Sequence, residues 1–180
     1  KGWEDYRAVA SYDRETWFRV DTEFDGKVMT VRHTPERDSV YYAYFEPYSW
    51  ERHLSLLGGA EHSPLARVED LGNTVDGRDL NMVVVGDPEA PKKIWIIARQ
   101  HPGESMAEWL VEGTLNALLD PANPFAREIL QRAVVYVVPN MNPDGSVRGN
   151  LRTNAAGANL NREWMTPSLE TSPEVYYVKN

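Results

Sequence analysis

The sequence predicts an α/β protein in which an amino-terminal antiparallel β-sandwich-like domain is followed by the first part of a mixed-sheet α/β domain. Short β-branched and aromatic runs, separated by turns, fill the first third of the chain. Beyond them, apolar runs alternate with stretches of helical periodicity, an order typical of a sheet covered by helices. We place the boundary after residue 47, so that residues 1–47 form the carboxy-terminal part of the β domain and residues 48–180 an incomplete α/β domain.

The β domain is predicted to contain strands at residues 16–20, 27–32 and 40–45. Asp25-Gly26 and residues 35–39 are typical of the turns between them. Five aromatic residues gather at the end of this segment: Tyr41, Tyr42, Tyr44, Phe45 and Tyr48. We expect them to serve in core and interdomain packing, because aromatic rings bury large apolar areas.

The second segment alternates helical and apolar patterns. We expect a helix at residues 49–57 ending at Gly58-Gly59, buried strands at 79–85, 93–98 and 133–138, and helices at 105–119 and 125–131. A polar, glycine-rich loop of some twenty residues follows Pro139, and such loops beside buried strands often carry function. Ser172 and Pro173 indicate the start of a further helix, and we interpret its short remainder as a sign that more chain belongs to the fold.

Composition excludes several classes of protein. The formal net charge of the 180 residues is −8, which disfavours nucleic acid as a partner, because phosphate binding needs a basic surface. No apolar run approaches the roughly 20 residues needed to cross a bilayer, so no membrane role is expected. The absence of cysteine fits a cytoplasmic protein and restricts any metal site to histidine and carboxylate ligands.

His101-Pro102-Gly103-Glu104 lies where a predicted buried strand ends and a helix begins, the position at which open α/β sheets bind ligands. A histidine and a glutamate on either side of a tight turn can direct a nitrogen and a carboxylate to one zinc ion. The spacing alone is weak evidence. His33 and Glu36 have the same spacing, but they lie in a turn between predicted strands with no helix after it, and we interpret that pair as a solvated turn.

Further motifs follow in the loop after Pro139: Asn142-Pro143-Asp144-Gly145, then Arg152-Thr153-Asn154, then Asn159-Leu160-Asn161-Arg162-Glu163-Trp164. Together with the His-Pro-Gly-Glu motif, and in this order, they resemble the zinc carboxypeptidases related to carboxypeptidase A. The cytosolic carboxypeptidase branch is most similar, and the resemblance extends over essentially the whole chain.

The resemblance implies a role for each matching residue. His101 and Glu104 would be the first two ligands of one Zn²⁺ ion per complete active site. Arg152 would polarise the scissile carbonyl and stabilise its oxyanion, while Asn161 and Arg162 would bind the substrate's terminal carboxylate. Asn159 stands where the carboxypeptidase A group has an aspartate that orients the first histidine ligand, and its carbonyl oxygen can still accept a hydrogen bond.

Three further features of the loop have other interpretations. We interpret Asn142-Pro143-Asp144-Gly145 as a turn that shapes the loop, and Trp164 as a packing residue. Arg148 is an alternative candidate for the role of Arg152.

The family pattern also requires a histidine and a glutamate general base downstream, and neither is found in this sequence. We therefore expect the sequence to be truncated. We expect the complete protein to be a zinc metallocarboxypeptidase that removes carboxy-terminal residues from peptides or protein tails. Two alternatives stay open: a zinc-dependent deacylase of small N-acyl amino acids, and a non-catalytic binder of acidic carboxy-terminal tails. The sequence does not indicate the oligomeric state or the side-chain specificity.

Overall fold

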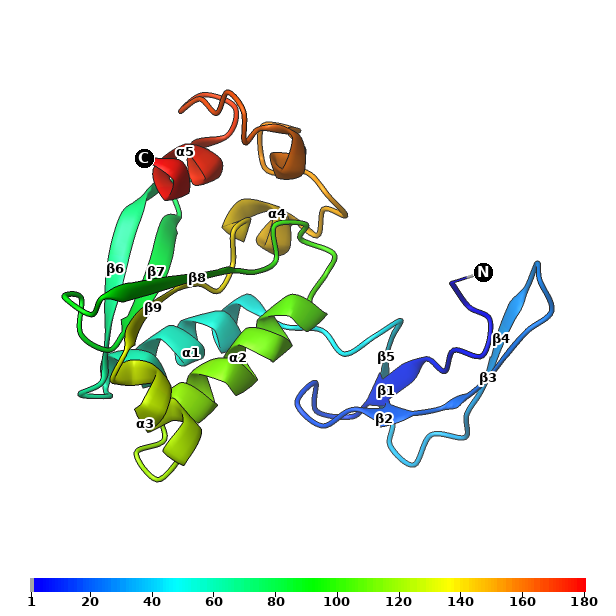
Figure 1. Ribbon diagram of the computed structural model, residues 1–180. Helices are drawn as coiled ribbons and strands as arrows, with labels where there is room; N and C mark the ends of the chain where they lie inside the picture. The colour runs from blue at the N-terminus through cyan, green and yellow to red at the C-terminus, as the bar shows by residue number, and fades with distance from the viewer. Residues whose placement is uncertain (1) are drawn as a thin grey trace. The chain divides into compact units, whose positions relative to one another are not determined.

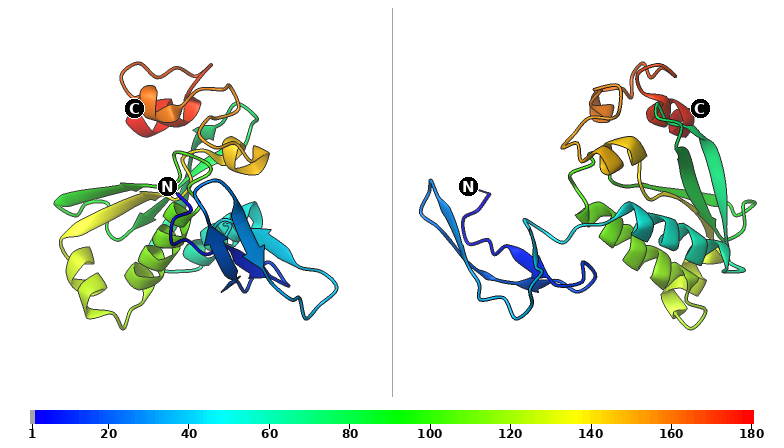
Figure 2. Two further views of the ribbon diagram at one scale, coloured as in Figure 1. Left: turned by 90° about the vertical axis from the view of Figure 1, so that its right-hand side faces the viewer. Right: turned by 180° about the vertical axis from the view of Figure 1, so that it is seen from behind.

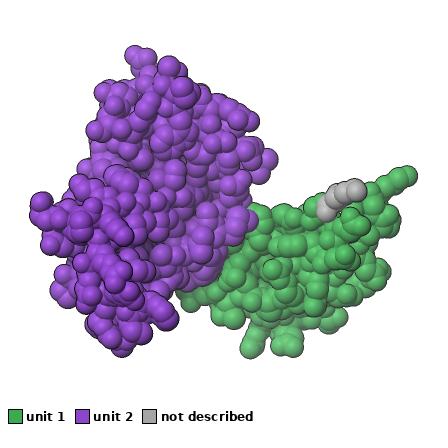
Figure 3. Space-filling model, viewed as in Figure 1, with its two compact units in different colours: residues 1–47 green, residues 48–180 purple. Residues whose placement is uncertain are grey.

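The computed structural model describes residues 2–180, and the chain divides into two compact units, residues 1–47 and 48–180 (Figure 3). Each unit is described below by itself.

The first unit contains two small antiparallel sheets. Strands β1 (Val9–Ser11), β2 (Phe18–Arg19) and β5 (Tyr41–Ala43) form one sheet in the order β2-β1-β5, and β3 (Asp21–Phe24) pairs with β4 (Met29–Arg32). Ala8, Ala10 and Val20 form a small core against Phe18, Val31 and Val40. The predicted antiparallel β fold is confirmed, although the sequence patterns did not indicate β1 and β3.

The expectation of core packing was wrong for three tyrosines in and just after β5, whereas Tyr48 is buried as expected. Tyr41, Tyr42 and Tyr44 are 44%, 49% and 39% exposed. They contact other rings and polar groups at the surface: the Tyr44 ring lies 4.2 Å from that of Trp3, and the Tyr42 hydroxyl lies 2.9 Å from His33 Nδ1. Because β5 is short and its unit has so small a core, the rings pack beside one another instead of being buried.

The second unit is built on a mixed sheet of β6 (Ala66–Asn73), β7 (Asp79–Val85), β8 (Lys92–Ile97) and β9 (Ala133–Val138), in the order β6-β7-β9-β8. Neighbouring strands are antiparallel except for β8 and β9, which run parallel. A parallel pair needs a long crossover. Helices α2 (Met106–Leu119) and α3 (Pro124–Leu130) supply it (Figure 1).

Helices cover both faces of this sheet (Figure 2). On one face, α1 (Trp50–Glu61), α2 and α3 bury a core that includes Leu57, Leu115 and Ala126 against alternate residues of β7 and β9. On the other face, the opposite set of β7 and β9 residues packs against Met141, Leu160 and Val175. These three residues belong to the loop after β9 and to η1 (Leu160–Arg162) and α5 (Pro173–Lys179). The predicted α/β architecture is confirmed.

Helix α1 does not end at Gly58-Gly59 as expected but continues to Glu61. Glycine costs a helix about 1 kcal/mol relative to alanine, which is less than burial of a large apolar side chain contributes. Leu57 and Ala60, on either side of the glycines, are both buried in the core. Tertiary packing therefore overrides the local stop signal.

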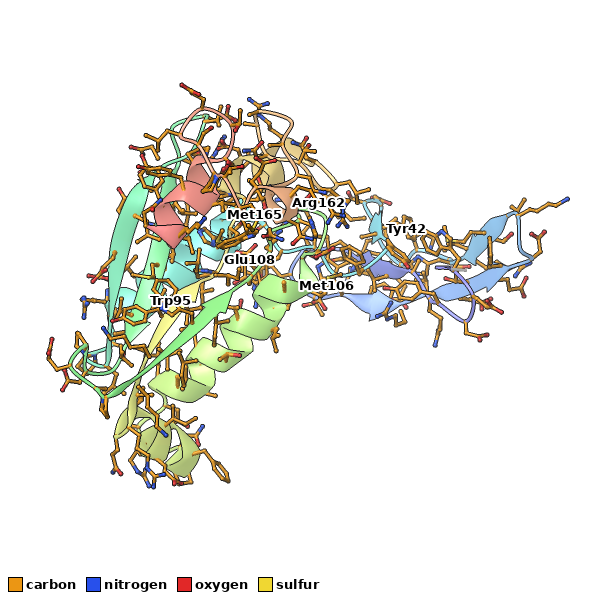
Figure 4. All side chains as sticks on the ribbon, turned by 45° about the horizontal axis from the view of Figure 1, so that its top comes forward. Tyr42, Trp95, Met106, Glu108, Arg162 and Met165 are labelled. Atoms are coloured by element: carbon orange, nitrogen blue, oxygen red, sulfur yellow. The ribbon has the colours of Figure 1, made fainter. Side chains whose placement is uncertain are left out.

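Strand β8 was expected to be buried, but it is the edge strand of the sheet over residues 2–180. Ile94, Trp95 and Ile97 are substantially exposed, and Trp95 stacks on Tyr136 of β9 at 4.8 Å between ring centroids (Figure 4). The continuous apolar pattern is correct for a strand, but it does not reveal the strand's place in the sheet. None of the helices in the described part of the chain is long and apolar enough to cross a membrane.

Candidate metal centre and active site

The loop between β8 and α2 carries the His-Pro-Gly-Glu motif at the carboxyl end of the parallel strands (Figure 1). A hydrogen bond of 3.0 Å from Glu104 N to His101 O closes the turn, so the two side chains leave it from its two ends. Gly103 N donates to Leu151 O at 3.0 Å, and a Cβ on Gly103 would lie only 2.9 Å from Leu151 Cδ1. The added Cβ would also lie 3.0 Å from Leu151 O, so glycine is favoured here because a second loop passes directly beside the turn.

The side chains of His101 and Glu104 converge. His101 Nδ1 lies 3.1 Å from Glu104 Oε1, with the imidazole almost buried and the carboxylate half exposed. Two ligand atoms at about 2.0–2.2 Å from one tetrahedral zinc ion are themselves separated by roughly 3–3.5 Å. The nitrogen and oxygen donors therefore fit zinc in type and in separation.

The other ring nitrogen of His101 has two neighbours, Asn159 Oδ1 at 3.3 Å and Arg152 Nη2 at 3.0 Å. Asn159 Oδ1 can only accept a hydrogen bond, so that contact requires a hydrogen on His101 Nε2. The Arg152 guanidinium can only donate, so its contact requires the lone pair of His101 Nε2. The two hydrogen bonds therefore exclude one another. A neutral histidine that binds a metal through Nδ1 carries its hydrogen on Nε2. In that state Asn159 accepts a hydrogen bond from the ring, and the Arg152 guanidinium is released from it.

Arg152 and its alternative, Arg148, lie in different surroundings. Arg152 lies beside both motif residues, since its Nη1 is also 3.5 Å from Glu104 Oε1. Arg148 instead binds Asp76 through two hydrogen bonds, of 2.8 Å from Nε and 2.5 Å from Nη2. This ion pair holds the pKa of Asp76 below its usual value, mainly through the hydrogen bond from Arg148. The structure thus brings Arg152, and not Arg148, to His101 and Glu104.

Asn161 and Arg162 lie in η1, which Asn159 caps by accepting a hydrogen bond from Asn161 N at 3.2 Å. Both are exposed, and within residues 2–180 the Arg162 side chain makes no ion pair (Figure 4). Trp164 Nε1 donates to Gln100 Oε1 at 2.6 Å and so ties this segment to the residue before His101. Gln100 could not be identified from the sequence as the partner of Trp164, because nothing in its local pattern indicates a contact 64 positions away.

Asn142-Pro143-Asp144-Gly145 is not simply a turn, as expected, but opens the short helix α4 (Pro143–Arg148). Asn142 caps it by accepting a hydrogen bond from Gly145 N at 3.0 Å, and proline at the first helical position lacks only an N–H that the helix does not use. Asp144 is fully buried and accepts hydrogen bonds from Thr74 Oγ1 and Arg78 Nη1. The motif therefore anchors the loop to the β6–β7 hairpin.

Replacement of Gly145 by alanine should destabilise the protein by about 1–3 kcal/mol, the usual cost of overpacking a well-packed site. A Cβ at this position would lie 2.4 Å from Pro102 Cγ in the His-Pro-Gly-Glu turn and 2.6 Å from Thr153 O. The free energy of unfolding in denaturant measures the effect in the full-length protein. Gly113→Ala in α2 is the matched control, because nothing lies within 4 Å of its added Cβ. Equal stability of the two variants would contradict the prediction.

Asn154, which is buried, anchors the loop that carries Arg152. Its Nδ2 donates to Thr171 O at 2.9 Å and to Glu174 Oε2 at 3.1 Å, and its Oδ1 accepts from Ala158 N. Burial raises the pKa of Glu174 to about 7, and the hydrogen bond from Asn154 opposes that rise. The contact between the loop and α5 has no local sequence signal, since its partners are 20 positions apart.

Two ligands do not complete a zinc site, which uses three protein ligands in catalytic proteins. Within residues 2–180 no group of three histidine, aspartate or glutamate residues could hold a metal ion. His33 lies in the first unit beside two tyrosine hydroxyls, and His53 lies in α1, where its Nδ1 is 2.8 Å from Glu108 Oε1.

Comparison with known proteins agrees with these motifs. The family model described as "Zinc carboxypeptidase" matches residues 54–175, and that described as "Cytosolic carboxypeptidase N-terminal domain" matches residues 1–45. A crystal structure of a metallo-carboxypeptidase from Burkholderia cenocepacia is 61% identical with a TM-score of 0.93, and the match covers 99% of this chain and 49% of that one.

Two protein sequences extend the comparison. An uncharacterised protein of Zymomonas mobilis is 48% identical over 99% of this chain and 47% of its own length. Human cytosolic carboxypeptidase 1 is 34% identical over 81% of this chain and 13% of its own length. The chain thus spans at most about half the length of these relatives.

The mixed sheet, the His-Pro-Gly-Glu motif after β8 and the family match define the class: this chain belongs to the zinc carboxypeptidase family. Within that family the chain is similar to the cytosolic carboxypeptidases, since residues 1–45 match the model of their amino-terminal domain and the human relative carries that name.

Proposed function

We propose that the protein is a zinc-dependent metallocarboxypeptidase that hydrolyses the carboxy-terminal peptide bond of peptides or protein tails. His101 and Glu104 would hold the zinc ion, with a third histidine from protein sequence outside these 180 residues. A bound zinc ion would act as a Lewis acid and lower the pKa of a water molecule, so that the water attacks at neutral pH. The observation that carries the proposal is the convergence of His101, Glu104 and Arg152 within 3.5 Å of one another.

The chain's own residues have separate tasks in this proposal. Asn159 would fix the His101 ring by accepting the hydrogen of Nε2, which leaves Nδ1 free as a ligand. Arg152, once its guanidinium leaves the ring, would donate hydrogen bonds to the scissile carbonyl oxygen as negative charge develops on it. The glutamate that takes a proton from the water and passes it to the leaving amine would also lie outside this sequence.

Asn161 and Arg162 would bind the free terminal carboxylate of the substrate. An exposed guanidinium without an ion pair among the described residues is available for a bidentate contact, and Asn161 can add a side-chain hydrogen bond. Their segment is tied to the metal motif through Trp164 and Gln100, which fixes its distance from the reacting bond. This arrangement would restrict the enzyme to the last residue of a chain.

Arg162→Ala in the full-length protein should raise KM for peptides with a free terminus about 10–100-fold, because hydrogen bonds to charged groups contribute about 1.5–3 kcal/mol. Activity on the corresponding carboxy-terminal amides, already low, should change little. Steady-state kinetics on matched free and amidated peptides test this. Undiminished preference of the variant for free termini would contradict the role of Arg162.

Substrate assays and zinc content of the full-length protein separate the two alternatives. Hydrolysis of N-acyl amino acids without hydrolysis of peptides would favour the small-molecule deacylase. Tight binding of acidic tails by a protein without stoichiometric zinc would favour the non-catalytic binder. We further propose a cytoplasmic location, which rests on the match to the cytosolic carboxypeptidase branch.

A further inference from the structure

Glu108 of α2, four residues after Glu104, is fully buried, and the proposed chemistry makes no use of it (Figure 4). Three groups from three separate segments converge on its carboxylate. His53 Nδ1 of α1 lies 2.8 Å away, Arg99 Nη1 beyond β8 lies 2.5 Å away, and Asn140 Nδ2 beyond β9 lies 3.2 Å away. The three partners are buried as well.

Arg99 connects this carboxylate to the metal motif. Its Nε donates to Pro102 O at 2.8 Å, inside the His-Pro-Gly-Glu turn, and its Nη1 also donates to Tyr48 O at 2.9 Å. Arg99 has φ of +46°, a left-handed conformation that is strained for a non-glycine residue. The backbone is held in this conformation where it turns from the strand into the motif, and the side chain then reaches back to the turn.

Asn140 connects the carboxylate to the other end of the motif. Its Oδ1 accepts from Asn142 N at 2.9 Å, and Asn142 Nδ2 in turn donates to Gln100 O at 3.3 Å. The backbone carbonyls of Gln100 and Pro102, on either side of His101, are thus both held by side chains linked to Glu108.

Another carboxylate of the same helix provides a comparison. Glu112, one turn further on, pairs with Arg52 at 2.8 and 2.6 Å and accepts from the Tyr48 hydroxyl. This pair is partly exposed, and neither side chain contacts the motif. Burying an ion pair such as Glu108–Arg99 adds little stability, because desolvation offsets the attraction. Stability alone therefore accounts for the Glu112 pair better than for the Glu108 cluster.

We propose that Glu108 is a positioning residue that holds residues 100–104, through Arg99 and Asn140, in the conformation in which His101 and Glu104 face each other. The proposal rests on the proposed function for its metal but not for its geometry. Removing the charge of Glu108 should loosen the two carbonyl contacts and let the ligand side chains separate.

Glu108→Gln in the full-length protein tests this, with Glu112→Gln as the matched control. We expect zinc affinity, measured by competition with a chelator, to fall about 10–100-fold in Glu108→Gln, the range found when partners that orient metal ligands are removed. In the metal-free protein, amide hydrogen exchange at residues 100–104 should become faster. Glu112→Gln should change neither quantity, whatever its effect on thermal stability.

Arg99→Lys provides a second variant if Glu108→Gln does not fold, because it keeps the positive charge but cannot bind Pro102 O and Glu108 together. It should likewise weaken zinc binding and speed exchange in the turn. Zinc affinity and exchange equal to those of Glu112→Gln would overturn the positioning role. Failure of the wild-type protein to bind zinc would overturn the proposed function instead, and the exchange measurement would still decide the role of Glu108.

Discussion

His101→Ala should remove stoichiometric zinc from the full-length protein and lower peptidase activity by more than about 100-fold. Losing a residue that only orients a ligand costs about 10–100-fold in affinity or activity, and loss of a ligand itself must cost more. His101 is the more buried of the two donors, and its Nδ1 lies 3.1 Å from Glu104 Oε1. Elemental analysis of purified protein and steady-state kinetics measure the two effects.

His33→Ala is the matched control for this prediction. His33 has the same three-residue spacing from a glutamate, but it lies in the other compact unit with its ring beside Tyr12 and Tyr42 hydroxyls. We expect this variant to keep its zinc and its activity. If zinc content survived in His101→Ala and fell in His33→Ala, the metal centre would have to be placed in the first unit.

Arg152→Ala should lower kcat by about 100–1,000-fold with little change in KM, which is the effect of removing one donor from an oxyanion site. The physical reason is its position. The guanidinium lies 3.0 Å from His101 Nε2 and 3.5 Å from Glu104 Oε1, within one side-chain movement of the place where the carbonyl oxygen would develop charge. Zinc content should remain unchanged, because neither ligand is removed.

Arg148→Ala distinguishes the two candidate arginines. Arg148 binds Asp76 through two hydrogen bonds, so its loss should reduce stability by about 1 kcal/mol and leave kcat near the wild-type value. A large fall in kcat for Arg148→Ala, with Arg152→Ala near normal, would exchange their assignments. Denaturant unfolding and kinetics of both variants give the comparison.

Much of the second unit could be predicted from local pattern. The run at residues 79–85 coincides with β7, that at 133–138 with β9, and the helical spacing after Ser105 with α2. Predictions failed where a tertiary contact outweighed the local signal. Helix α1 continues through Gly58-Gly59 because Leu57 and Ala60 are buried. Strand β8 lies at the edge of the sheet within residues 2–180, and its side chains are partly exposed there.

The candidate site divides in the same way. Residue type and position at the end of a predicted strand suggested His101 and Glu104 as zinc ligands, because zinc accepts nitrogen and carboxylate ligands. The resemblance to the zinc carboxypeptidases was needed to strengthen that pair and to select Arg152. The resemblance favoured Arg152 over Arg148, but the local pattern did not separate them, since both lie in one polar loop with no periodicity. Only the folded chain pairs Arg148 with Asp76 and brings Arg152 to His101.

By itself, the sequence determined the class of fold, the position of the His-Pro-Gly-Glu motif between a strand and a helix, and the kinds of side chain near it. Tertiary structure alone decided which side chains converge: Gln100 with Trp164, Asn154 with Glu174, and Glu108 with its three partners. The reason is physical. Hydrophobic periodicity reports how one segment buries its own apolar face, whereas a polar contact between distant segments depends on the register at which the whole core packs.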